Sequence, residues 1–291
     1  MQADFLLYWK ETARKGDTAM KRHDLHLHTA LSLCARETAA VPGYLEQASK
    51  LGLDTIGFSN HVWDSRVPMP GPNPWYEAQS VERAMEIRKT VPTDTGEIRV
   101  LIGVETEFAQ GVLGLSEEAA VGLDYVLIPH SHIHMTDFVC PHEVSEPAEI
   151  ARHMAGTFRD LVTRGTAAIR DSGTPVIVAH PFCPVARDGA GQLTAIFAHL
   201  SDGLFEDLFC RAAEQAVGIE INLNVFHGNP GASLYEDTYY RMFAAAKRMG
   251  CRFSIGSDSH AVEELDRIRQ DEEVIRRSGL EDGDFIDLVR L

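Results

Sequence analysis

The sequence is poor in cysteine, has fewer basic than acidic residues and contains no long apolar run. Its five cysteines are an odd number, lie far apart and form no C-x-x-C pair, which is typical of reduced thiols in a cytosolic protein. The apolar run at residues 5–9 is too short for a secretory signal or a membrane span, and no other segment approaches the length of a span. We therefore expect a cytoplasmic protein with no membrane segment.

The charge balance excludes two classes of partner. Lys and Arg number 27 against 43 Asp and Glu, so the net charge is −16 with neutral histidines, and such a surface repels nucleic acid and anionic lipid. A composition of 44% hydrophobic and 24% charged residues is that of a globular protein and excludes disorder or a collagen-like chain. No composition shift marks a domain boundary, so we predict one domain over residues 23–291 after an extension of residues 1–22. No feature predicts the oligomeric state.

Seven short apolar stretches end abruptly in polar residues, and helix-like segments lie between them. The stretches are 22–29, 55–61, 98–108, 125–134, 175–182, 218–224 and 252–260. Strands that alternate with helices pair in parallel, and seven of them predict a closed or nearly closed β/α barrel. The proline-rich segment 67–77 follows the second stretch, where barrel enzymes place loops that close over substrate.

Histidine is abundant, with 13 residues, most of them in clusters beside Asp or Glu. A barrel gathers the carboxyl ends of its strands in one ring. Because side chains alternate along a strand, His26 and His28 share one face, as do Asp258 and His260. Imidazoles two residues apart at a strand end can hold one ion, so the pattern predicts a divalent metal centre.

Seven motifs carry a resemblance to a known family. They are DLHLHT (24–29), SNH (59–61), GVE (103–105), DYVLIPHSH (124–132), AHPF (179–182), EIN (220–222) and GSDSH (256–260). In this order they resemble the PHP (polymerase and histidinol phosphatase) domain, over nearly the whole chain. The resemblance implies an α/β fold, a distorted seven-stranded (β/α)7 barrel of the PHP type, with two or three divalent metal ions, commonly zinc, manganese or iron, and hydrolysis of phosphoesters.

The resemblance also implies a ligand set. Its members are His26, His28, His61, Glu105, His132, His180, Asp258 and His260, with Cys34 as a further candidate. Glu105 would bridge a first metal, held with His26, His28 and Asp258, to a second one held by His132 and His180. His61 and His260 would hold a third metal. Cys34 stands where some members have a third-site His, and a thiolate there would favour zinc, although a buried thiol without a metal is the other interpretation.

Two parts of the pattern depart from the family. His130 and His134 flank His132, and the sequence leaves the choice of ligand among them open. In the histidinol phosphatase branch an Arg that grips phosphate follows the EIN motif, whereas this chain has His227 there. The absence of a bidentate guanidinium at this position weakens the interpretation that the substrate is a phosphate ester, but does not exclude it. The substrate-binding candidates, besides His227, are the loop residues Arg36, Arg66 and Arg187.

The function that we predict is that of a metal-dependent hydrolase acting on a small phosphate ester. Histidinol phosphatase activity is one candidate within this class, which His227 in place of the Arg makes weaker. A hydroxide bridging two metals of a di- or trinuclear site would attack phosphorus, and the predicted catalytic residues are Glu105, Asp258, His227 and His260. His227 or His260 would protonate the departing oxygen. Two alternatives stay open: the same metal centre acting on an amide or lactone, and a non-catalytic metal-binding barrel.

Overall fold

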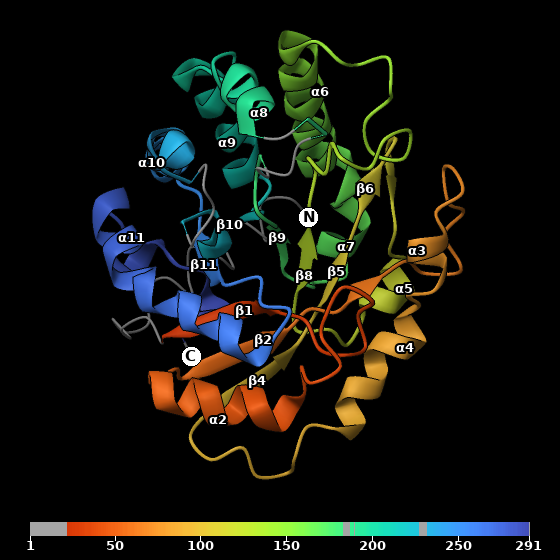
Figure 1. The fold of residues 1–291 in the computed structure, drawn as a ribbon, viewed down its shortest axis with the longest axis vertical. Helices are drawn as coiled ribbons and strands as arrows, with labels where there is room; N and C mark the ends of the chain where they lie inside the picture. Colours follow the sequence, from red (N-terminus) through yellow and green to blue (C-terminus); the bar gives the residue numbers. More distant parts are fainter. Residues whose placement is uncertain (1–21, 183–186, 189, 227–231, 291) are drawn as a thin grey trace.

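The computed structural model describes residues 22–182, 187–188, 190–226 and 232–290. The predicted extension, residues 1–22, lies outside this part of the chain except for Arg22. Strands occupy the centre of the molecule and helices surround them (Figure 1). No helix among the described residues combines the length and the apolar character needed to cross a membrane.

Each of the seven predicted stretches contains at least one strand, and all the pairings among these strands are parallel. One sheet has the order β1 (His23–Leu27), β2 (Thr55–Phe58), β4 (Arg99–Ile102). The other has the order β11 (Phe253–Gly256), β10 (Gly218–Asn222), β9 (Val176–Val178), β8 (Val126–Ile128), β5 (Val104–Thr106), β3 (His61–Val62). A separate antiparallel hairpin pairs β6 (Phe108–Ala109) with β7 (Val112–Leu113).

The helices follow the strands along the chain. The α-helices are α2 (Val41–Leu51), α3 (Pro74–Glu77), α4 (Val81–Met85), α5 (Glu117–Ala120), α6 (Pro147–Asp160), α7 (Ala167–Asp171), α8 (Ala190–Phe197), α9 (Asp202–Glu214), α10 (Ala232–Arg248) and α11 (Asp271–Ser278). A π-helical turn, η2 (Leu161–Gly165), joins α6 to α7, and the 3₁₀ segments are η1 (Glu86–Lys89), η3 (Leu223–Phe226), η4 (Val262–Gln270), η5 (Asp282–Asp284) and η6 (Asp287–Val289). This alternation confirms the predicted α/β class with parallel pairing.

The two parallel sheets meet at two places. The chain passes from β4 to β5 through Gly103, whose N–H donates to the Phe58 carbonyl at 2.9 Å. At the other edge, β1 approaches β11 through a bridge between Leu27 and Ser259. The pairings of the described strands form two parallel sheets in contact in place of the single barrel sheet of seven strands, because the chain is interrupted between β2 and β3 and between β4 and β5.

Tyr125 fills the space between the strands below the site. It is fully buried, and its hydroxyl donates to the Leu25 carbonyl at 2.7 Å. A Cβ added at Gly103 would lie 2.6 Å from the Tyr125 ring, and Gly57 faces the same ring at comparable range. Real Cβ atoms do not approach so closely, so these two strands need glycine to admit the ring.

Candidate metal centre

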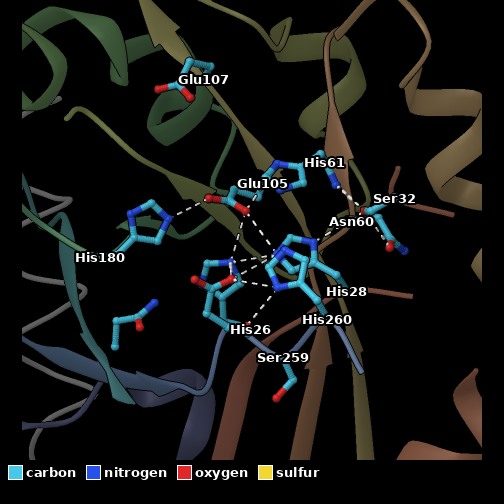
Figure 2. Close-up of polar contacts among 12 residues, drawn as sticks. His26, His28, Ser32, Asn60, His61, Glu105, Glu107, His180, Ser259 and His260 are labelled. Atoms are coloured by element: carbon cyan, nitrogen blue, oxygen red, sulfur yellow. Dashed lines mark hydrogen bonds and ion pairs between the residues drawn. The ribbon is translucent and has the colours of Figure 1, made fainter. Parts of the chain in front are cut away.

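The predicted side chains meet at the carboxyl ends of the parallel strands. His26 lies on β1, Glu105 on β5, and His61 opens β3 directly opposite Glu105 in the parallel register. His180 and Asp258 follow β9 and β11 by two residues. Figure 2 shows Glu105 between His180 on one side and the pair His26 and His28 on the other. The fold therefore brings together side chains from five strands.

The innermost group consists of His26, His28 and Glu105, all buried. The Nε2 atom of His26 lies 3.1 Å from Glu105 Oε2 and 3.1 Å from His28 Nε2. The same His26 nitrogen lies 3.5 Å from Asp258 Oδ1. His28 Nε2 lies 3.2 Å from Glu105 Oε2 and 3.5 Å from Asp258 Oδ1. Both nitrogens thus face both carboxylates.

Glu220 fixes the tautomer of His26. Its Oε1 atom lies 2.6 Å from His26 Nδ1, so the ring donates its Nδ1 proton to Glu220 in a hydrogen bond and Nε2 is the atom left to bind a metal. The Nε2 atoms of His26 and His28 then face the carboxylate oxygens of Glu105 and Asp258, and carboxylates in a buried space need positive charge beside them, either protons on these rings or a bound cation. The chemistry of this donor set fits a divalent ion held by imidazole and carboxylate.

The second oxygen of Glu105 faces a different pair of histidines. Its Oε1 atom lies 2.9 Å from His180 Nε2, and Glu105, His132 and His180 form a further group with metal-ligand spacing. The His132 Nδ1 atom lies 2.7 Å from Glu107 Oε2, so a second carboxylate orients a second imidazole. Glu105 therefore has one oxygen on each of two candidate metal positions, which is the arrangement of a bridging carboxylate.

A third group contains His28, Cys34, His61 and His260. The Nδ1 atom of His61 is buried, has no hydrogen-bond partner among the described residues and lies 3.3 Å from Glu105 Oε2. Burial, and then the charges of Glu105 and Asp258, raise the pKa of the Cys34 thiol to about 12. A cation beside Cys34 would offset those charges. An orphaned imidazole nitrogen beside this thiol fits a third metal position.

The electrostatics of the site call for positive charge. Burial alone would raise the pKa of Glu105, but His61, His26 and the hydrogen bond from His180 hold it well below its ordinary value. Burial alone would lower the pKa of His26, yet Glu220, Glu105 and Asp258 raise it well above its ordinary value. Glu105 therefore stays ionised, and in the absence of a metal the acidic neighbours of His26 keep its imidazole protonated.

Two features of the backbone accommodate this packing. His180 has φ 25° and Asp258 has φ 54°, a region that non-glycine residues seldom adopt and that is found preferentially at functional sites. Gly256 lies between Glu220 and His26, and a Cβ there would come within 2.6 Å of His26 Cβ and would also overlap Glu220 Oε1. Only glycine at this position lets Glu220 reach the His26 ring.

The structure separates the three neighbouring histidines of the fourth motif. The His130 ring is fully buried against Phe158 and Phe182, at centroid distances of 5.1 and 4.8 Å. His132 and His134 both line the pocket, and of the three only His132 belongs to a group with Glu105. The geometry thus favours His132 as the ligand.

The three arginines predicted to reach a substrate do not line the pocket. Arg66 is paired with Asp64 at 3.0 Å and Glu118 at 2.9 Å. Arg187 donates to four backbone carbonyls in the segment 133–144, and Arg36 is exposed. None of the three is among the residues that line the pocket of about 400 Å³ over the site. His227 lies outside the described residues.

Sequence reasoning missed the roles of Glu220 and Glu107 and the aromatic side of the pocket. Glu220 was visible only as part of a motif, although its placement two residues before Asn222 on one strand face is a signal that it points inward. The Glu107 Oε2 atom contacts His132 Nδ1 and accepts a hydrogen bond from the Tyr76 hydroxyl at 3.2 Å. No pattern in the segment 67–77 indicated which aromatic residues face the site.

Comparisons with known proteins agree with this architecture. A family model described as the PHP domain matches residues 24–285. The zinc, L-histidinol and phosphate complex of histidinol phosphate phosphatase from Lactococcus lactis subsp. lactis is similar, with a TM-score of 0.61, 16% identity, and coverage of 92% of this chain and 99% of that one. A putative histidinol phosphatase from Listeria monocytogenes gives a TM-score of 0.57 and 14% identity over 84% of this chain and 97% of that one. No curated protein matches the sequence. At these identities the structural likeness concerns the fold.

Proposed function

The chain belongs to the PHP domain family, and we propose that it is a metal-dependent hydrolase that cleaves a small phosphate ester at a di- or trinuclear centre. One observation carries the proposal. The Nε2 atoms of His26 and His28 and the Oε2 atom of Glu105 lie 3.1 to 3.2 Å from one another, while His26 Nδ1 donates a hydrogen bond to Glu220. Such a group of buried acceptors is what a metal ion binds.

The proposed ligands divide into three sets. His26, His28, Glu105 and Asp258 would hold the first metal, Glu105 with His132 and His180 the second, and His61 with His260 and Cys34 the third. Zinc, manganese and iron are the candidate ions. When bound, divalent ions would stabilise the charge on the phosphoryl oxygens and lower the pKa of a bound water molecule to near neutrality.

The chain's own residues orient the ligands and control protons. Glu220 and Glu107 hold the Nδ1 sides of His26 and His132, which keeps the Nε2 side of each ring available. Burial, and then the charge of His28, lower the pKa of His260. A neutral His260 suits a ligand better than a proton donor at neutral pH, so His227 becomes the proposed donor to the leaving oxygen.

Two further parts of the proposal concern the whole molecule. We propose that the two sheets together correspond to the seven-stranded barrel that the family resemblance implies. The contacts between the sheets at Gly103 and at Leu27–Ser259 support this proposal. A cytoplasmic location is supported by the free state of Cys34, Cys140, Cys210 and Cys251.

The test is a substrate panel on protein of known metal content. Two samples are assayed against phosphomonoesters, phosphodiesters and lactones. One is protein purified without chelator, and the other is apoprotein to which manganese, zinc or iron has been restored. We expect hydrolysis of a phosphate ester that disappears with the metal and returns with it. Metal-independent hydrolysis would refute the proposal, and so would stoichiometric metal with no turnover, which is the behaviour of a non-catalytic metal-binding barrel.

A second function has one observation in its favour. Among the described residues that line the pocket there is no Lys or Arg to pair with a phosphate group. The same metal centre acting on a lactone or an amide would need no such cation. Turnover of lactones without turnover of phosphate esters in the panel, or of an amide added to it, would select this alternative.

A further inference from the structure

The pocket over the metal centre has two unlike sides. One side, the metal floor, consists of the ligand side chains described above. The other, the aromatic wall, is formed by Trp75, Tyr76 and Met135. The metal floor is used by the proposed chemistry, whereas the aromatic wall has no part in it. Because Trp75 is only partly buried, part of its apolar surface is available to a bound molecule.

The aromatic wall is held in place by interactions behind it. The Trp75 ring packs edge-on against Tyr76 at 4.7 Å and against His61 at 4.8 Å. Tyr76 is fully buried, its hydroxyl donates to Glu107 at 3.2 Å, and its N–H donates to Asn73 Oδ1 at 3.2 Å. A stacked contact with Phe138 at 5.8 Å supports its other side. The wall is therefore a preformed surface next to the metal floor.

The charges around the aromatic wall restrict what can bind against it. The described lining residues include no Lys or Arg for a second anionic group. The acidic lining residues, Glu105 and Asp258, already face imidazoles of the metal floor and are not available to an ammonium group. A charged group placed here would lose its water without a partner, whereas an apolar ring would gain contact area.

We propose that the aromatic wall binds a neutral aromatic ring on the alcohol side of the ester, so that the enzyme selects arylalkyl phosphates over short alkyl or aminoalkyl phosphates. The inference rests on the proposed phosphoesterase function and specifies its substrate class. Trp75 is the specificity-determining residue. Its ring lies within 4.8 Å of the His61 ring, so an aromatic group on Trp75 would adjoin a phosphate at the metal floor.

The test compares esters that differ in the ring alone. Ethyl phosphate and 2-phenylethyl phosphate have leaving alcohols of similar basicity, and 2-aminoethyl phosphate adds a positive charge instead of a ring. Burying a ring of this size is worth about ten- to a hundredfold in kcat/KM. We expect 2-phenylethyl phosphate to exceed ethyl phosphate by about that factor and 2-aminoethyl phosphate to gain nothing. A ratio below about threefold, or a preference for the amine, would overturn the inference.

Variants assign the preference to Trp75. The W75A variant should lower the ratio of the two kcat/KM values by about tenfold, while W75F should keep most of it. Both esters meet the same metal centre, so any loss of metal beside His61 changes both rates and leaves the ratio intact. Trp63 contacts Tyr76 at 5.8 Å but does not line the pocket, so W63F should leave the ratio unchanged. A ratio that survives W75A would overturn the assignment.

A binding measurement separates this inference from the proposed function. Phosphonates with the same two carbon groups cannot be hydrolysed, and calorimetry on metal-loaded protein gives their affinities directly. We expect 2-phenylethylphosphonate to bind at least about tenfold more tightly than ethylphosphonate, even if no phosphate ester is turned over. Failure of turnover alone would then remove the phosphoesterase function and leave the aromatic wall supported. Equal binding of the two phosphonates, or no binding of either, would overturn the inference.

Discussion

The metal floor and the aromatic wall lie a few ångströms apart and are built in different ways. Most ligands of the floor, namely His26, His28, His61, Glu105, His180 and Asp258, lie on parallel strands or within two residues of them, whereas His132 and His260 follow their strands by four residues and Cys34 by seven. The wall comes from the four-residue helix α3 and from a loop after β8. Strand geometry fixes the direction of a side chain by alternation alone, whereas a loop needs a network of hydrogen bonds to do the same. We therefore assign the chemistry to the floor and substrate selection to the wall.

The largest expected effect comes from the residue shared by two metal positions. Replacing Glu105 with Ala should remove metal and lower turnover by about three orders of magnitude or more, because Lewis-acid stabilisation is worth several kcal/mol. Metal content and kcat are measured on the same sample. Glu97 is exposed at the amino end of β4, so E97Q is the matched control and should change neither quantity.

The next effect tests the packing under the floor. The G256A variant should lower the free energy of unfolding of metal-free protein by about 1–3 kcal/mol, because its Cβ overlaps Glu220 and His26. Gly156 in α6 has open space around its Cβ position. The G156A variant should therefore be neutral or more stable by up to about 1 kcal/mol. Equal destabilisation by the two substitutions in denaturant titrations would contradict this account of Gly256.

Glu220 tests how the floor orients its ligands. The E220Q variant keeps the size of the side chain but removes the charge that holds the Nδ1 proton of His26. We expect a fall of about 10- to 100-fold in metal affinity, measured by competition with a chromophoric chelator. The aromatic wall does not contact Glu220, so the preference for 2-phenylethyl phosphate at saturating metal should persist. Unchanged metal affinity would show that Glu220 has no part in the floor.

The smallest effect concerns the loop that precedes the wall. Burial alone would raise the pKa of Asp64, but hydrogen bonds from Arg66 and Ser116 lower it below its ordinary value of 3.8. Its ionised form therefore stabilises the fold fully above pH 3.8, and the contribution is lost as pH falls through the lower folded pKa. We expect D64N to be less stable by about 1 kcal/mol at neutral pH. The difference should shrink below pH 4 in denaturant titrations, and a difference that grows there would contradict the assignment.

The features that the sequence predicted lie mainly on the strands of the metal floor, and those that it did not predict lie mainly in loops. The strand stretches and the α/β class were predictable, because alternation and parallel pairing follow from local pattern, whereas the grouping of His26, His28, Glu105 and Asp258 was implied by the family resemblance. The His26–Glu220 contact was not predictable, since it depends on which strands neighbour each other and on the missing side chain of Gly256.

The loops account for what the sequence did not predict. Arg187 was a substrate candidate, but its guanidinium donates to backbone carbonyls that lie 43 to 54 residues earlier in the chain, and no sequence pattern records such a contact. The segment 67–77 was predicted as a loop over the site, yet the orientation of Trp75 depends on the hydrogen bonds of its neighbour Tyr76. The positions of these loops along the chain could be predicted, but the orientations and contacts of their side chains could not.

The most direct measurement of the central claim is anomalous diffraction at the metal edges from crystals of protein purified without chelator. The account predicts one peak among His26, His28, Glu105 and Asp258 and a second between Glu105 and His180. A third peak beside Cys34 and His61 would complete the centre. A floor without any peak would contradict the account, and so would a metal found only at the exposed cluster of Asp137, His142 and Glu143.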